Sequence, residues 1–111
     1  MVWNYEAMSE RMLNDHSLVE IIIVHFLNNI PSQIETLTQN IQKGELKLIQ
    51  HQSHFIKGSV ANIGGEAMLD VTSSIEEESG RGNLEKIQSL LPVLVSHFND
   101  LEEILTEYLN K

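Results

Sequence analysis

Apolar residues recur at spacings of three and four along nearly the whole chain, and no stretch alternates apolar and polar residues with a period of two. Spacings of three and four place side chains on one face of an α-helix, whereas a half-buried strand requires the period of two. The longest such pattern lies in the last third of the chain, at Leu84, Ile87, Leu91, Leu94, Phe98, Leu101, Leu105 and Tyr108. The sequence therefore predicts an all-α fold.

Capping residues and glycines divide the chain into five predicted helices. Asn and Asp favour helix starts because their side chains accept a hydrogen bond from a free backbone N–H, and glycine favours helix ends. The predicted helices cover residues 3–13 with Asn4 as a possible cap, a long segment from Asp15 or Ser17 to residue 43, residues 45–64 and 66–79, and residues 84–108 capped by Asn83. Met8, Met12 and Leu13 are expected to face inward. Pro31 predicts a kink near residues 27–31, and Pro92 predicts a bend.

Short connections between long amphipathic helices make neighbouring helices antiparallel. We therefore expect an up-and-down antiparallel four-helix bundle with an additional short N-terminal helix laid across one end. A chain of 111 residues forms a single core, and we expect residues 1–111 to form one domain.

The chain is acidic, with 16 Asp and Glu against 7 Lys and Arg and a formal net charge of −9. This balance argues against nucleic acid and anionic membrane as partners, since both are bound through basic patches, and favours a protein partner. The longest aliphatic run, Ile21–Val24, is far shorter than the roughly 20 residues that span a bilayer. No basic-start signal peptide precedes it, and no cysteine is present for a disulfide or a thiolate site.

The segment around His54 departs from a plain amphipathic helix. Its apolar face is formed by Leu46, Ile49, Ser53, Ile56, Val60 and Ile63. Successive helix residues are rotated by about 100°, so His54 is predicted to face solvent. Lys57 and Gly58 follow at the two spacings that bring helix side chains together, and so share its surface. Glycine inside a helix costs about 1 kcal/mol relative to alanine, which suggests that another molecule approaches closely here.

A lysine beside a histidine disfavours the imidazolium form and competes with a metal ion. The same cation suits a histidine that becomes anionic, as it does when a phosphoryl group is attached to a ring nitrogen. The chain has no glycine-rich phosphate loop followed by Lys-Ser/Thr, so it cannot phosphorylate His54 from ATP by itself. We therefore expect no autonomous kinase activity.

The pattern His54-x-x-Lys57-Gly58, followed by Gly64, resembles the signature of histidine-containing phosphotransfer (HPt) domains of phosphorelays. Residues 26–31 resemble the helix that precedes the phosphorylated one in that family, including its proline, and residues 80–84 resemble the family's turn between the last two helices. The resemblance covers almost the whole chain. It implies that His54 accepts and donates the phosphoryl group, that Lys57 stabilises its charge, and that Gly58 leaves room for the docking receiver domain.

The resemblance also implies the surroundings of the reaction. The partners would be the receiver domains of a response regulator and of a hybrid sensor kinase. Magnesium would be held by the receiver, and this chain would carry no cofactor or metal of its own. We expect a cytoplasmic monomer, either free or tethered as the C-terminal domain of a membrane sensor kinase.

Two alternatives concern the histidines. A helical adaptor whose histidine is incidental is the competing function. His51 lies one turn before His54 and is expected at the rim of a docking surface or as inert surface. A metal site formed by this pair is disfavoured because neither has an acidic residue three positions before it. His16, His25 and His97 are expected at the surface or at helix edges.

Overall fold

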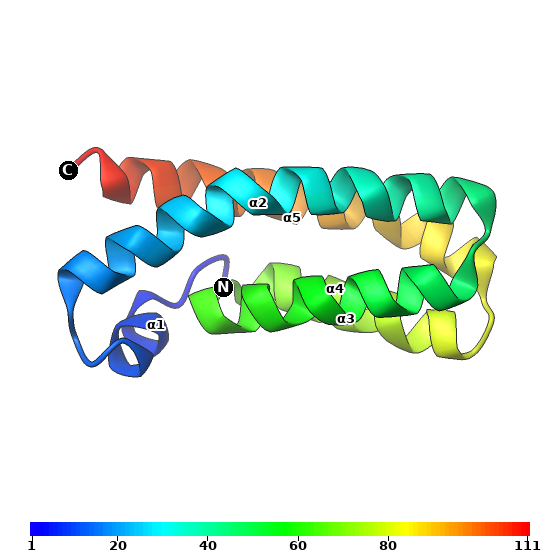
Figure 1. Ribbon diagram of the computed structural model, residues 1–111, viewed down its shortest axis with the longest axis horizontal. Helices are drawn as coiled ribbons and strands as arrows, with labels where there is room; N and C mark the ends of the chain where they lie inside the picture. The colour runs from blue at the N-terminus through cyan, green and yellow to red at the C-terminus, as the bar shows by residue number, and fades with distance from the viewer.

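The structure, a computed structural model, describes residues 1–111 and contains five helices and no strands. The helices are α1 (Tyr5–Arg11), α2 (His16–Lys43), α3 (Leu46–Ile63), α4 (Glu66–Gly80) and α5 (Leu84–Leu109). Figure 1 shows α2 to α5 running lengthwise beside one another, with α1 at one end. Around the bundle, α3 packs against α2 and α4, and α5 packs against the same two helices. The predicted all-α bundle is confirmed, with helix ends that differ from the predicted ones by at most two residues.

Three helix starts are capped as the sequence predicts. The side-chain oxygens of Asn4, Asp15 and Asn83 accept hydrogen bonds from backbone N–H groups three residues further on, over 3.0, 3.1 and 3.2 Å. These bonds satisfy donors that have no partner within the helix. Of the two candidates at the start of α2, Asp15 is therefore the cap.

Pro31 lies inside α2 without ending the helix. Figure 1 shows α2 changing direction along its length, so that its first half is inclined to its second half. A proline removes one backbone hydrogen bond and pushes against the preceding turn, which accounts for a bend at this point. Ile30 and Ile34 on either side of it are both buried. The apolar face therefore continues through the kink.

The core is a single cluster of apolar side chains contributed by all five helices. On α3 the predicted apolar face is buried at Ile49, Ser53, Ile56, Val60 and Ile63. The Ser53 hydroxyl donates to the Ile49 carbonyl over 2.7 Å, so its burial leaves no unsatisfied donor. Burial of this face fixes the rotation of α3 about its own axis, and the opposite face is held toward solvent.

The predicted inward position of Leu13 is wrong. Met8 and Met12 are buried as expected, but the Leu13 residue is 88% exposed. The helix α1 ends at Arg11, and both Leu13 and Asn14 adopt positive φ angles of 55° and 58° in the turn that follows. The helical spacing that would place Leu13 beside Met12 therefore no longer applies there.

The N-terminal segment forms hydrogen bonds with the last carbonyl groups of α3. The Trp3 indole donates to the Ile63 carbonyl over 2.8 Å, and the Arg11 guanidinium donates to the carbonyls of Ala61 and Asn62 over 2.8 and 3.2 Å. The Asn4 N–H donates to the Gly64 carbonyl over 2.8 Å. The last carbonyls of a helix have no partners within it, so these bonds anchor α3 to the N-terminal segment.

Replacing Gly64 with alanine is expected to destabilise the fold by about 2 kcal/mol or more. Gly64 has a φ of +85°, and an added Cβ would lie 2.6 Å from the Asn4 carbonyl oxygen. Gly58→Ala is the matched control: an added Cβ meets nothing within 4 Å, and removing a mid-helix glycine should stabilise by about 0.5–1 kcal/mol. Urea unfolding of both variants measures the difference. Equal effects of the two changes would contradict this account of Gly64.

Candidate functional site

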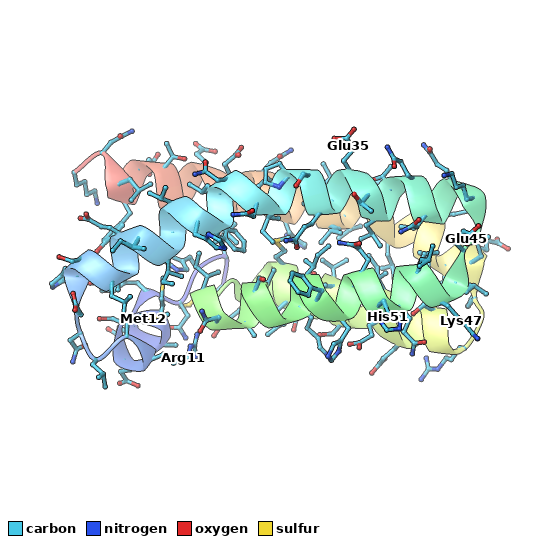
Figure 2. The ribbon with its side chains drawn as sticks, in the orientation of Figure 1. Arg11, Met12, Glu35, Glu45, Lys47 and His51 are labelled. Atoms are coloured by element: carbon cyan, nitrogen blue, oxygen red, sulfur yellow. The ribbon has the colours of Figure 1, made fainter.

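His54 lies near the middle of α3 on the solvent face, and its side chain is 70% exposed. Gly58 is exposed one turn further on, and the space around it is open. His51 is also exposed, and Figure 2 shows it projecting from α3. The structure therefore brings together the three residues singled out from the sequence, His54, Lys57 and Gly58, on one accessible surface.

A carboxylate from the neighbouring helix α4 completes this surface. The Glu76 Oε2 atom lies 2.6 Å from Nδ1 of His54, and its Oε1 atom forms an ion pair with Nζ of Lys57. Glu76 thus bridges the two residues. The sequence predicts that the Lys57 ammonium lies beside the ring. In the structure this cation is paired with Glu76, a residue that the sequence analysis did not identify.

The electrostatics of Glu76 favour its ionised form. The hydrogen bond from Lys57 lowers the pKa of Glu76, partial burial opposes this, and the contact with His54 lowers it further. An ionised carboxylate can only accept hydrogen bonds. With Glu76 as acceptor, the neutral ring therefore carries its proton on Nδ1 and leaves the lone pair of Nε2 free. This tautomer is assigned from the hydrogen-bond network.

Bound in this way, His54 presents an exposed nucleophilic nitrogen. The Nδ1–H···carboxylate contact orients the ring and makes Nε2 more electron-rich, as a buried carboxylate does for histidines in other sites. The Glu76 side chain is only 19% exposed, against 70% for His54. The orienting carboxylate is thus mostly covered by the protein, whereas the imidazole is mostly in solvent.

Beside His54, on the side of α3 that faces α2 and not α4, lies a surface without Asp, Glu, Lys or Arg. The Phe55 and Leu48 residues are 63% and 49% exposed, although both are large and apolar. Two hollows between α2 and α3 meet at Phe55 and Gln33, and no Asp, Glu, Lys or Arg lines either of them. Exposed apolar surface beside a reactive group is typical of a site that another protein covers.

Other kinds of site find less support in the structure. No group of three or more His, Cys, Asp or Glu side chains is arranged to hold a metal ion. His51 and His54 line one shallow hollow with Gln50 and Glu76. None of the five helices combines the length and the apolar character needed to cross a membrane.

Comparison with known families agrees with this fold. The family model of the Hpt domain matches residues 22–110. The match covers α3, α4 and α5 and all of α2 except its first residues. The chain therefore belongs to the Hpt domain family.

Two individual proteins are similar to the chain. The phosphorelay intermediate protein rdeA of Dictyostelium discoideum is 29% identical over 83 residues, which cover 75% of this chain and 33% of that protein. The chain thus spans about a third of the length of this relative. The crystal structure of histidine-containing phosphotransfer protein B (HptB) from Pseudomonas aeruginosa PAO1 superposes with a TM-score of 0.91 over 98% of this chain and 95% of that one, at 16% identity. It shares the five-helix fold.

The Glu76 contacts should make stability depend on pH. The pKa of Glu76 is lowered in the fold, so its ionised form stabilises the protein above the ordinary value of 4.5, and this contribution is lost as the pH falls below that value. We expect Glu76→Gln to lower the free energy of unfolding at pH 7 by about 1 kcal/mol or less, and by less still at pH 3. Urea unfolding between pH 7 and 3 tests this. Glu77→Gln, at the exposed next position of α4, should show no comparable change.

Proposed function

We propose that this Hpt domain is a phosphoryl carrier of a two-component phosphorelay. In the accepting step the lone pair of His54 Nε2 attacks the phosphorus of a receiver-domain aspartyl phosphate. The Nε2–P bond forms, the aspartate O–P bond breaks, and the carboxylate leaves with the electron pair. The reverse chemistry on a second receiver passes the group on. The observation that carries this proposal is an exposed imidazole whose Nδ1 is held by Glu76 while Nε2 is free.

Lys57 and Gly58 have separate roles in this proposal. The Lys57 side chain is 33% exposed and lies within reach of both Glu76 and the surface around His54. It would donate hydrogen bonds to the phosphoryl oxygens, where a charged donor contributes about 1–2 kcal/mol. Gly58 leaves open space one turn from the ring, where the receiver must approach closely enough for in-line transfer.

The docking surface of the receiver would include Phe55, Leu48 and the two hollows between α2 and α3 that no Asp, Glu, Lys or Arg lines. Residues of this kind form the dry centre of a protein interface, and charged residues are depleted there. The partners would be the receiver domains of a response regulator and of a hybrid sensor kinase. The chain would act as one unit over residues 1–111, in the cytoplasm and as a monomer.

The chemistry that the carrier lacks would come from the partner. We propose that magnesium is bound by the receiver and that this chain needs no cofactor and makes no use of ATP. Its contribution is the position and tautomer of His54, because phosphoryl transfer depends mainly on alignment and on charge stabilisation. It would thus be an intermediate in transfer and not a kinase.

His54→Gln should abolish phosphoryl acceptance without altering the fold, because the residue is exposed and glutamine is a good helix former. Incubation with a phosphorylated receiver domain, followed by detection of an acid-labile and base-stable phosphoryl group, measures acceptance. His51→Gln is the control and should retain a substantial fraction of transfer. If the native chain binds receivers but is never phosphorylated by any of them, the adaptor function is correct instead.

Gly58→Gln should slow transfer by roughly tenfold to a hundredfold while leaving the bundle at least as stable. Its longer side chain would occupy the open space that the receiver needs, whereas helix propensity improves. Gly58→Ala should have a smaller effect on transfer, since it adds one carbon. Stopped-flow or quenched transfer assays with one receiver give the rates, and circular dichroism checks the helices. Wild-type rates for the glutamine variant would refute the access role.

A further inference from the structure

The contact between Glu76 and Nδ1 of His54 is directed at the nitrogen that does not react. The carboxylate oxygen lies 2.6 Å from Nδ1 and leaves Nε2 free. Its other oxygen is anchored by Lys57, and the side chain is mostly covered by the surrounding helices. The carboxylate is thus in place before phosphorylation, on the side of the ring away from the nitrogen that would carry the phosphoryl group.

The protonation state of Nδ1 decides how easily the phosphoryl group leaves. When Nδ1 carries a proton, cleavage of the Nε2–P bond returns the electron pair to Nε2 and releases a neutral imidazole. When Nδ1 has lost its proton, the same cleavage must release an imidazolate anion, which is a far poorer leaving group. A carrier that must pass its phosphoryl group on therefore needs the first form.

We propose that Glu76 holds the proton on Nδ1 of phosphorylated His54 and so sets the upper end of the pH range in which the group is passed on. This inference rests on the proposed carrier function and makes Glu76 a positioning residue, because it acts through the ring and does not touch phosphorus. The proposed role differs from the role of Glu76 in the accepting step. There the unmodified neutral ring always has one proton, and Glu76 decides only which nitrogen carries it.

The charges around the ring favour this role. The titratable groups placed near it are His51 and Lys57 from α3 and Glu76 from α4. An anion in hydrogen-bond contact favours the protonated ring, whereas the Lys57 cation opposes it. A phosphoryl group on Nε2 brings negative charge that attracts Lys57, and this weakens the pairing of Lys57 with Glu76. Phosphorylation should therefore increase the hold of Glu76 on the Nδ1 proton.

The reaction can be followed without a partner by using water as the acceptor. A water oxygen attacks phosphorus, the Nε2–P bond breaks with its electron pair going to Nε2, and the two water protons leave on inorganic phosphate. Nδ1 keeps its proton throughout. Phosphoramidate serves as the donor: Nε2 attacks its phosphorus, and ammonia leaves.

The test compares the wild type with Glu76→Gln, Glu76→Asp and Glu77→Gln, each phosphorylated with phosphoramidate and checked by circular dichroism. The ¹⁵N shift of Nδ1 in histidine-labelled protein gives the protonation of the phosphorylated ring between pH 5 and 9, and ³¹P spectra give the rate of phosphate release. We expect Glu76→Gln to lower the midpoint pH of Nδ1 protonation and the midpoint pH of phosphate release by about one pH unit each, which corresponds to a tenfold loss of proton affinity. Glu76→Asp should fall between, and Glu77→Gln should match the wild type.

The outcomes separate the two proposals. Coincident midpoints for the wild type and Glu76→Gln would overturn the role of Glu76 while leaving His54 as the carrier residue. An equal shift in Glu77→Gln would also overturn it, because the effect would then be one of net charge. If neither phosphoramidate nor a phosphorylated receiver modifies His54 in the wild type, the carrier function itself fails and this inference fails with it.

Discussion

Burial of the apolar face of α3 is the constraint on which the site depends. Ile49, Ile56 and Val60 have no exposed surface, and each would lose roughly 2 kcal/mol of transfer free energy if the helix rotated outward. The hydrogen bonds from Trp3 and Arg11 then hold the end of the helix in position. A helix fixed at its core and at its end presents His54 in one direction, although most of that side chain is in solvent.

The second constraint is the packing of α4 against α3, which supplies the carboxylate. Glu76 comes from a helix whose own inward residues, Val71 and Ile75, are buried in the same core. The bundle thus aligns a histidine, a lysine and a carboxylate that all lie within helices packed on the core, and none of them lies on a loop. Rigid elements hold such groups more closely to one geometry than loops do. The imidazole of His54 is therefore exposed to solvent, yet Glu76 holds its orientation through Nδ1.

The arrangement separates stability from reactivity. Gly64 is a glycine that the fold requires, because it ends α3 with a positive φ and a tight contact with Asn4. Gly58 has no such requirement, and the fold would gain from its replacement. The structure gives no reason for this cost in stability, which is consistent with the proposal that Gly58 keeps the surface beside the ring of His54 accessible.

The sequence by itself determined the five helices, their caps, the kink at Pro31 and the solvent face on which His54, Lys57 and Gly58 lie, because helical periodicity and capping are local properties of the chain. It also led to the phosphotransfer family, through the pattern around His54 together with residues 26–31 and 80–84. The position of Leu13 was predicted wrongly, because the end of α1 depends on a left-handed turn that periodicity does not reveal. Glu76 could not be identified either. It is the first of three consecutive acidic residues, Glu76, Glu77 and Glu78, and only the rotation and register of α4 against α3 decide which of them reaches the ring. That choice belongs to the tertiary structure, since it is made by the packing of two apolar faces far apart in the sequence.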